Sequence, residues 1–404
     1  MAGSPHSGIA YRSALFALPS IHLPQRLAPQ AAPGIGGAAH RWTGSDRSAK
    51  GRRNRAGRQK LRQDLPGLLR AHAIPQEDIE DCLGDAFGQT GPPPTYVTAP
   101  GRIVAVGDIH GDIVKAAAAL CAAGVLGEED GLPIWTGGDT TIVQIGDVLD
   151  RGDSEIGSLM LLRALDQQAR EEGGAVYMLN GNHESLNLCG NFRYVTAGGY
   201  KESAMVAGLR GHQLERLECQ KQARRMLYAP GGMIARQLAL NPTVLIVNDT
   251  AFAHGGILPT HVQYGLEQIN DDVSAWMRGT RNAEGNLRKP PFLAMGDPSS
   301  VMWNRMFSQE KFKTPWERHH VCSQLQRTLE MLQVRQMVVG HTPQVNGANC
   351  ECDRRVWRVD VGMSRGVLNA RPQVLEISRD AAGDTFTRLL MPGNGPLPRP
   401  AFWR

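Results

Sequence analysis

Short runs of β-branched residues, each ending in a polar loop that contains glycine, recur along this chain and constrain its fold more than any other feature. Amphipathic segments with helical periodicity separate several of these runs. The strands expected from them cover 103–106, 141–145, 175–179, 244–247, 336–339 and 356–359. The helices expected between them cover 113–126, 156–170 and 322–333. This alternation predicts an α/β fold whose strands are buried on both faces.

A run of prolines marks where we expect this α/β domain to begin. The sequence Gly91-Pro92-Pro93-Pro94 can form neither a helix nor a central strand. We therefore assign 98–392 to the main domain and 61–97 to a polar connector with one possible helix around 77–87. Residues 393–404 are assigned to a C-terminal tail because glycine and proline dominate its start.

One segment inside the main domain does not fit the alternation. Residues 200–235 are rich in Arg, Gln and Glu and have no place among the expected strands. We interpret them as a small helical insertion that could cap a functional site. No stretch of the chain approaches the roughly 20 uninterrupted apolar residues that a membrane span requires, so we expect no membrane insertion.

The formal charge of +5 belongs to the first 60 residues rather than to the expected domain. Residues 1–60 hold ten of the 44 Lys and Arg and one of the 39 Asp and Glu, which leaves 34 basic and 38 acidic residues elsewhere. A nucleic-acid-binding protein should carry its positive charge on the folded surface, so we expect no nucleic-acid partner. Scattered Ser, abundant Ala and Gly and the scarcity of acid are typical of an organelle transit peptide, plastid or mitochondrial. The alternative is a disordered basic arm, with a nuclear signal at 50–55.

The seven cysteines are odd in number and irregularly spaced. A chain of 404 residues does not need disulfides to stabilise its core. Cys350 and Cys352 are not spaced as in a zinc ribbon, and no second pair accompanies them. We expect reduced, structural thiols in an intracellular compartment. The alternative is a redox role for Cys350 and Cys352 in an exposed loop.

Five polar motifs follow expected strands, and each carries glycine beside its polar side chains. In chain order they are Gly107-Asp108-Ile109-His110-Gly111, Gly146-Asp147-Val148-Leu149-Asp150-Arg151-Gly152, Gly181-Asn182-His183-Glu184, Ala253-His254-Gly255-Gly256 and Gly340-His341-Thr342. Ligands of α/β folds bind at loops beyond the carboxyl ends of strands. Carboxylates, amides and imidazoles suit manganese, iron or zinc, and a single carboxylate can bridge two ions roughly 3.5–4 Å apart. One such motif alone indicates only a turn or an ordinary histidine, but five in order predict a dinuclear metal site.

The five motifs, with Glu184 directly after His183, resemble the phosphoprotein phosphatase branch of the calcineurin-like metallophosphoesterases. The runs at 187–195 and 359–364 are similar to the Shewanella-like protein phosphatases, and the resemblance covers roughly 98–392. It implies a β-sandwich flanked by α-helices, phosphoprotein substrates and a chloroplast location ahead of a mitochondrial one. The resemblance indicates no particular regulatory subunit.

The resemblance also implies a role for each metal-ligating residue. Asp108 and His110 would bind one divalent cation, Asp147 would bridge both, and Asn182, His254 and His341 would complete the second site. Manganese is the first choice of metal, with iron or zinc as alternatives. A metal-bound hydroxide would attack phosphorus in line, without a phosphoenzyme intermediate.

Four further residues would handle the proton and the phosphate. His183 would act as the general acid, and Asp150 would orient its imidazole. Arg151 would bind phosphate oxygens bidentately, and Arg305 resembles the second phosphate-binding arginine of the family. The alternative for Arg305 is a surface ion pair.

The resemblance leaves substrate type open but separates some members. The Ser-Ala-Pro-Asn-Tyr-Cys stretch of the toxin-sensitive phosphatases is absent at 360–365, which implies insensitivity to microcystin and okadaic acid. The motifs do not separate phosphoserine and phosphothreonine from phosphotyrosine.

Three other functions share these motifs in part. A diadenosine-tetraphosphatase-like hydrolase favours Asp where Glu184 stands and tends to lack the intact Asp-Arg-Gly of the second motif. A phosphodiesterase of the wider superfamily is the second alternative, but an arginine clamp suits a terminal phosphate monoester better than a diester. A catalytically inactive scaffold that binds phosphoproteins should have lost a metal ligand or the proton donor, and none is missing here.

Overall fold

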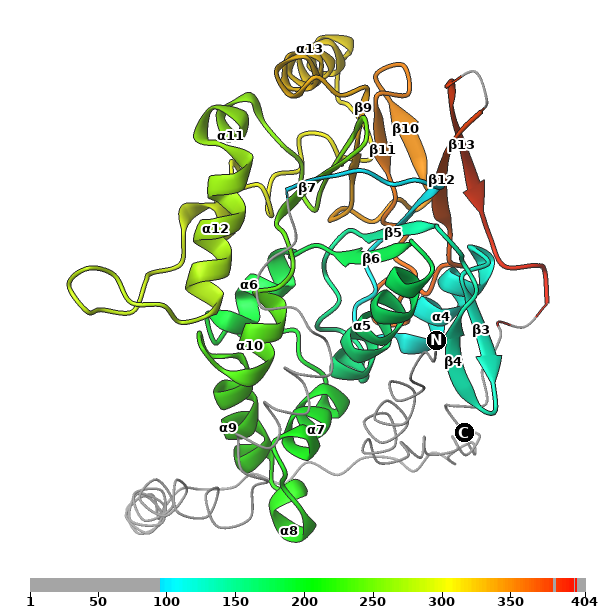
Figure 1. Ribbon diagram of the computed structural model, residues 1–404. Coiled ribbons are helices and arrows are strands. Elements are labelled where there is room, and N and C mark those ends of the chain that lie inside the picture. The colour runs from blue at the N-terminus through cyan, green and yellow to red at the C-terminus, as the bar shows by residue number, and fades with distance from the viewer. Residues whose placement is uncertain (1–94, 381–382, 396, 398–404) are drawn as a thin grey trace, which may run out of the picture.

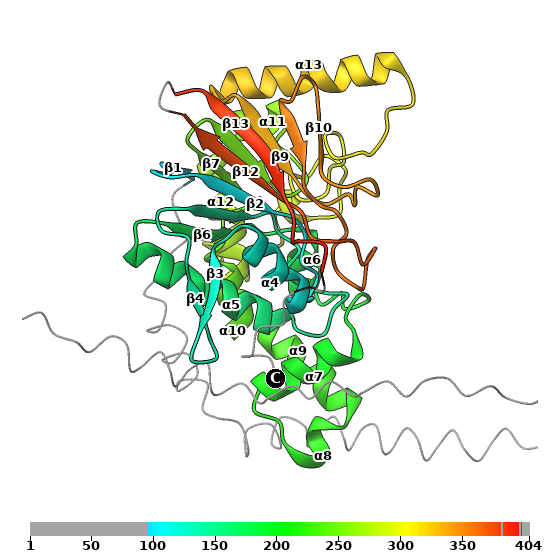
Figure 2. The same ribbon diagram turned by 90° about the vertical axis from the view of Figure 1, so that its right-hand side faces the viewer.

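Two β-sheets lie against each other at the centre of the computed structural model, and helices cover their outer sides (Figure 1, Figure 2). The structure describes residues 95–380, 383–395 and 397. This architecture is the α/β sandwich expected from the sequence. The transit peptide assigned to 1–60 and the helix expected around 77–87 lie outside the described residues.

The first sheet mixes parallel and antiparallel pairs in the order β1-β7-β8-β9-β11-β10. Its strands are β1 (Tyr96–Val97), β7 (Val244–Val247), β8 (Thr250–Ala253), β9 (Gln336–Val339), β10 (Asn349–Glu351) and β11 (Val356–Arg358). The short strand β1 pairs in parallel with β7, so the sheet takes in the last residues of the segment 61–97 that we expected to be a connector.

The second sheet has the order β13-β12-β2-β5-β6 and carries three of the five motifs. Its strands are β2 (Ile103–Val106), β5 (Thr141–Gln144), β6 (Ala175–Met178), β12 (Val374–Arg379) and β13 (Thr385–Leu390). β2, β5 and β6 run parallel to one another, so their carboxyl ends share one edge. A separate hairpin joins β3 (Leu126–Glu129) to β4 (Leu132–Trp135).

Alternate residues of the central strands enter two different cores, which explains why a strand such as β2 is apolar throughout. Ile103 and Ala105 of β2 face the other sheet, where they join a cluster that includes Phe252. Val104 and Val106 of the same strand face the helices and belong to the larger core. Burial on both faces, expected from the continuous apolar runs, is thus confirmed.

Helices on both outer sides complete the layers. They are α4 (Ile113–Ala122), α5 (Glu155–Glu171), α6 (Asn182–Leu188), α11 (Pro259–Tyr264), α12 (Leu266–Met277), the 3₁₀ turn η1 (Phe292–Ala294) and α13 (Pro315–Leu332). α5 contacts β6 and α12 contacts β7. Among the described helices, none combines the length and the apolar character that crossing a membrane would need.

The helix expected at 322–333 is longer than predicted because its start signal lies upstream. α13 begins at Pro315, where the missing amide hydrogen has no cost in the first turn. The side chain of Thr314 accepts a hydrogen bond from the backbone amide of Glu317, which caps the helix. These two residues extend the helix by two turns toward its N-terminus.

The insertion expected at 200–235 is helical and lies at one end of the molecule (Figure 1). It consists of α7 (Ala197–Val206), α8 (Gly211–Leu214), α9 (Leu217–Tyr228) and α10 (Met233–Leu238). α7 packs against both α9 and α5, so the insertion is attached to the helix that follows the second motif.

The expectation of reduced thiols is wrong for two of the cysteines. Cys322 of α13 and Cys352, in the turn between β10 and β11, form a disulfide with a Cα–Cα distance of 5.3 Å. Cys352 is buried rather than exposed, and Cys350 remains a free thiol. The spacing of 30 residues gave no sign of this pair, because the fold alone brings α13 over the hairpin.

Candidate metal centre

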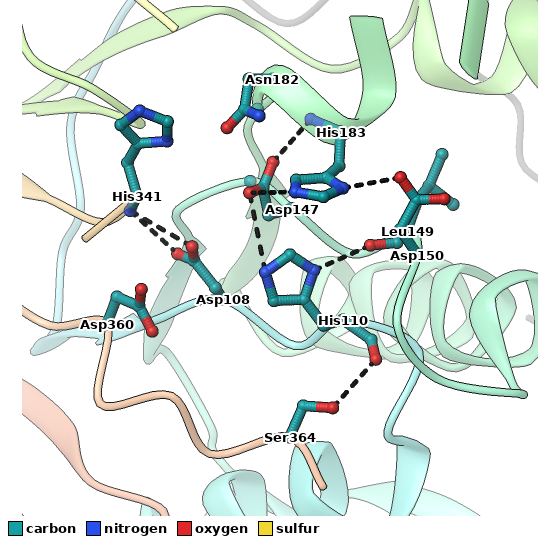
Figure 3. Close-up of polar contacts among 12 residues, drawn as sticks. Asp108, His110, Asp147, Leu149, Asp150, Asn182, His183, His341, Asp360 and Ser364 are labelled. Carbon is teal, nitrogen blue, oxygen red and sulfur yellow. Dashed lines mark hydrogen bonds and ion pairs between the residues drawn. The ribbon is translucent and has the colours of Figure 1, made fainter. Parts of the chain in front are cut away.

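The five motifs meet where strands of both sheets end. Asp108 follows β2, Asp147 follows β5 and Asn182 follows β6. His254 follows β8 and His341 follows β9, in the other sheet. Figure 3 shows the Asp147 carboxylate in the middle of the group, with His110 and His183 on one side and His341 beyond it.

Backbone hydrogen bonds lock the first two motif loops together. The amides of Ile109 and His110 both donate to the carbonyl of Asp147, at 3.1 and 2.9 Å. Several non-glycine residues here have left-handed backbones, namely His110, Asp147, Asp150, Arg151 and His341. Such conformations persist only where surrounding contacts fix them, and they gather at functional sites.

Two glycines are needed because the loops approach so closely. A Cβ atom on Gly181 would overlap the carboxylate of Asp147. One on Gly340 would overlap the carboxylate of Asp108. The glycines beside the polar residues therefore make room for the carboxylates themselves.

Glu184 fixes the backbone that presents Asp147. Its carboxylate accepts hydrogen bonds from the amides of Asp147 (2.9 Å), Val148 (2.9 Å), Leu149 (3.1 Å) and Gly181 (2.7 Å). Glu184 is fully buried, so these four amides replace its hydration. In the sequence, Glu184 contributed only to the family resemblance. In the structure, its hydrogen bonds hold the second and third motifs together.

Hydrogen bonds to carbonyl oxygens set which nitrogen of three imidazoles is protonated. His110 Nδ1 lies 3.0 Å from Leu149 O, His254 Nδ1 2.8 Å from Ile145 O, and His341 Nε2 3.1 Å from Trp303 O. A carbonyl oxygen can only accept, so each of these nitrogens donates its hydrogen. The other ring nitrogen of each histidine then faces the cluster, where its electron pair can bind either a metal ion or a proton, as in many metal sites.

The free nitrogens and the polar oxygens converge on common space. His254 Nε2 lies 3.0 Å from Asn182 Oδ1, 3.1 Å from His341 Nδ1 and 3.3 Å from Asp147 Oδ2. On the other side of Asp147, Oδ2 lies 3.8 Å from His110 Nε2 and 3.9 Å from His183 Nε2. Acceptors this close repel one another unless a proton or a metal cation lies between them. The residues therefore fit two divalent cations that share Asp147.

Two sets of three side chains have their ligand atoms within 4.8 Å of one another. One is His110, Asp147 and His183, and the other is Asp147, His254 and His341. Asp108 lies beside them, and its carboxylate accepts from the backbone amide of His341 at 3.2 Å. The structure thus brings all six predicted ligands to one place and adds the imidazole of His183 to the first set.

Three of the predicted ligands, His110, His341 and Asp147, have the protonation that a metal ligand needs. Burial lowers the pKa of His110 to about 4, and burial together with His254 lowers that of His341 to about 2, so both rings are neutral at pH 7. Burial alone would raise the pKa of Asp147, but His254 and His183 hold it well below its usual range. Burial opposes a charge on His254, yet Asp147 raises its pKa, so a proton can take the place of a cation there.

Asp360 is a further buried carboxyl at the site, and no role was predicted for it. It lies beside Asp108, and burial raises its pKa to about 6 (Figure 3). Burial and the charge of Asp360 together raise the pKa of Asp108 well above its usual value. Two neighbouring buried carboxyl groups gain from a cation, which is a second reason why this site suits one.

His183 and Asp150 form the pair predicted from the second and third motifs. His183 Nδ1 lies 2.6 Å from Asp150 Oδ2, and both side chains are buried. This bond leaves His183 Nε2 to face the cluster. Burial lowers the pKa of His183, but the charges of Asp147 and Asp150 outweigh it and raise the pKa above its usual value.

The two predicted phosphate-binding arginines lie at the edge of this cluster. The Arg151 guanidinium rests over the Tyr194 ring at 4.7 Å, and that ring lies 5.0 Å from the His183 ring. Arg151 Nε is buried without a hydrogen-bond partner among the described residues. Arg305 donates to the carbonyl of His341 and to Thr342 Oγ1, each at 2.8 Å, and no ion pair involves it in the described structure.

The model of the calcineurin-like phosphoesterase family matches residues 101–345. Shewanella-like protein phosphatase 2 of Arabidopsis thaliana is 38% identical over 317 residues, which are 71% of this chain and 78% of that protein. Shewanella-like protein phosphatase 1 of Plasmodium berghei is 29% identical, over 65% of this chain and 67% of that protein.

A solved structure shares the fold. The crystal structure of the cold-active protein-tyrosine phosphatase of a psychrophilic Shewanella aligns with a TM-score of 0.53 and 24% identity, over 74% of this chain and 83% of that one. Family match, sequence identity and shared fold agree with the strand-end cluster of carboxylates and imidazoles. The chain belongs to the Shewanella-like protein phosphatases, within the calcineurin-like metallophosphoesterase family.

Proposed function

We propose that this protein is a metal-dependent phosphoprotein phosphatase that hydrolyses phosphate monoesters. The proposed substrates are phosphoserine and phosphothreonine proteins, and phosphotyrosine proteins are a variant of the same proposal. The observation that carries it is the convergence of acceptor atoms around Asp147, directly beside the His183–Asp150 pair. The relatives named as protein phosphatases support this substrate class.

Two divalent cations, manganese first and iron or zinc as alternatives, would supply Lewis acidity and lower the pKa of a bound water. One would be held by Asp108, His110 and Asp147, and the other by Asp147, Asn182, His254 and His341. Asp147 is suited to the shared position because both sets of close ligand atoms include it.

The protein's own residues would place the phosphate and move the proton. The Nε2 atom of His183 would donate the proton to the departing oxygen, because Nδ1 is engaged by Asp150. Arg151 offers a guanidinium whose Nε–H has no partner in the described residues, as a group awaiting an anion would. Arg305, hydrogen-bonded to the carbonyl of His341, would bind a second phosphate oxygen.

The test is a substrate panel measured with manganese present. We expect turnover of phosphoserine or phosphotyrosine peptides and of an aryl phosphate, and little hydrolysis of diadenosine tetraphosphate. Asp147→Asn is the matched inactive control. Hydrolysis of diadenosine tetraphosphate without any phosphopeptide turnover would replace this proposal with the dinucleotide hydrolase. Metal binding without turnover of any of these substrates would favour a phosphoprotein-binding scaffold.

We also propose that residues 1–60 direct the protein to an organelle, the chloroplast first and the mitochondrion second. The support is compositional, since this segment is basic, nearly free of acid and rich in Ala, Gly and Ser. A fluorescent reporter fused to residues 1–60 should enter an organelle in plant cells. A diffuse cytosolic or nuclear signal would instead favour the basic-arm alternative.

A further inference from the structure

One arginine of the helical insertion is buried beside the His183–Asp150 pair, and the proposed reaction does not yet use it. Arg224 lies on α9 and its side chain has 0% exposure. It is surrounded by aromatic rings, of which Tyr228 is 4.4 Å from its guanidinium carbon. Its guanidinium approaches Asp150 Oδ1 to 3.6 Å. A charge this deeply buried needs specific partners, and they lead toward the active site.

The first partner is Asn187, which fixes the side chain of Asp150. Arg224 Nε and one terminal nitrogen both donate to Asn187 Oδ1, at 3.0 and 2.7 Å. A guanidinium can only donate, so the amide of Asn187 must turn its nitrogen the other way. That nitrogen donates to Asp150 Oδ1 at 3.0 Å and to the carbonyl of His183 at 2.9 Å.

The second partner is Glu155, which fixes the backbone of Asp150. Arg224 forms a two-pronged ion pair with Glu155, with N–O distances of 2.5 and 3.2 Å. Glu155 Oε1 in turn accepts from the backbone amide of Asp150 at 2.6 Å. Asp150 has a left-handed backbone at φ 68°, which its own propensities do not favour. Arg224 therefore restrains both the carboxylate of Asp150, through Asn187, and its backbone amide, through Glu155.

We infer that Arg224 is the positioning residue of the proposed general acid. It holds the Asp150 carboxylate with Oδ1 toward Asn187 and Oδ2 toward His183, which turns His183 Nε2 to the phosphate. The inference rests on the proposed function and gives the insertion a part in it. Lysine could keep the charge but not the planar fork that engages Asn187 and Glu155 together.

The kinetic test compares two leaving groups. A phosphoserine peptide releases a poor leaving group that needs a proton, whereas p-nitrophenyl phosphate releases a good one that needs little help. We expect Arg224→Met to lower kcat on the peptide by about 10- to 100-fold, and kcat on p-nitrophenyl phosphate by less than about threefold. KM should change little on either substrate. Arg224→Lys should give the same selective loss of kcat on the peptide. If Arg224→Met does not fold, Arg224→Lys alone tests the inference.

A double variant and a matched control separate positioning from a general structural role. If Arg224 acts through Asp150, Arg224→Lys combined with Asp150→Asn should be no slower on the peptide than Asp150→Asn alone. The control is Arg163→Lys, which alters another buried arginine that donates to Asn241 and the carbonyl of Gln237. It should lower thermal stability without changing the ratio of the two kcat values. Equal losses on both substrates, or additive losses with Asp150→Asn, would overturn the inference.

A structural readout makes the inference testable whatever the enzyme hydrolyses. A crystal structure of metal-free Arg224→Lys should show the Asn187 amide rotated and the Asp150–His183 contact lengthened beyond its 2.6 Å. An unchanged contact would overturn the inference while leaving the phosphatase proposal intact. Conversely, a displaced Asp150 in a protein whose wild type turns over no phosphopeptide would retain the positioning role and remove only the proposed function.

Discussion

The strand-end loops and the helical insertion contribute to the same site in different ways. The loops supply the atoms that converge on Asp147, and each loop is a few residues long with glycine beside its polar groups. The insertion supplies no member of the two close ligand sets. In our proposal it acts through Arg224, which contacts Asn187 and Glu155.

This contrast separates two tasks of a catalytic site. Direct ligands must lie at rigid, crowded positions, so they are placed by short loops at the carboxyl ends of strands and by left-handed backbones. Orientation of those groups can come from farther away, because a buried ion pair transmits position through hydrogen bonds.

Replacing the shared carboxylate should have the largest effect. Asp147→Asn removes a charge that both ligand sets use, and several kcal/mol of transition-state stabilisation correspond to a loss of about 10⁴-fold in turnover. The measurements are phosphatase activity and metal content by elemental analysis. Cys350→Ser, outside both regions, is the control and should keep nearly full activity. Wild-type rate and metal content in Asp147→Asn would contradict the shared site.

Removing the proton donor should have the next largest effect, and one that depends on substrate. His183→Asn leaves the departing oxygen without a proton source, so turnover of a phosphoserine peptide should fall by about 10²–10³-fold. Turnover of p-nitrophenyl phosphate should fall less. Steady-state kinetics on both substrates provide the comparison. A uniform fall accompanied by loss of bound metal would mean that His183 acts as a ligand, as its place in the first set allows.

Two buried glutamates offer a matched pair, one in each region. Glu184 accepts amides of the ligand loops, whereas Glu202 of α7 accepts the amides of Glu155, Ile156 and Gly157 at the start of α5. Glu184→Gln should weaken manganese affinity about 10- to 100-fold, because the NH₂ group of the new side chain would face backbone N–H groups of the ligand loops. Glu202→Gln should lower the melting temperature and leave manganese affinity unchanged. Calorimetric titration and thermal melts distinguish them, and equal effects of the two on manganese affinity would show that the regions are not separate.

Breaking the disulfide should change stability and leave turnover nearly unchanged. Cys322 and Cys352 close a loop of 30 residues, for which chain entropy predicts a loss of about 3–4 kcal/mol in the free energy of unfolding. Denaturant unfolding of Cys322→Ser measures this, with Cys121→Ser as the control for loss of a free thiol. A Cys322→Ser protein as stable as wild type would show that the crosslink contributes little.

The fold and the strand-end cluster could be predicted because their signals are local. A short run of apolar residues that is buried on both faces can be recognised in the sequence, as Val244–Val247 can. The Gly-Asp and Gly-His steps mark their own loops. Parallel neighbours then bring the motifs to one edge without further information.

The remaining features depend on contacts between segments far apart in the chain. Glu184 and Asp360 stood in recognised motifs, but only the structure shows which amides and carboxyls they meet. Arg224 is one of many charged residues in its segment. Its burial depends on aromatic neighbours on α7, on α9 and in the loop before α7. The Cys322–Cys352 pair likewise needed the position of α13. The early start of α13 is different, since Thr314 and Pro315 were readable signals.

Anomalous diffraction from crystals grown with manganese would locate the cations themselves. We expect two manganese peaks on opposite sides of the Asp147 carboxylate, one beside Asp108 and His110 and the other beside His254 and His341. A folded protein with one peak, or with none at this edge of the sheets, would contradict the dinuclear site.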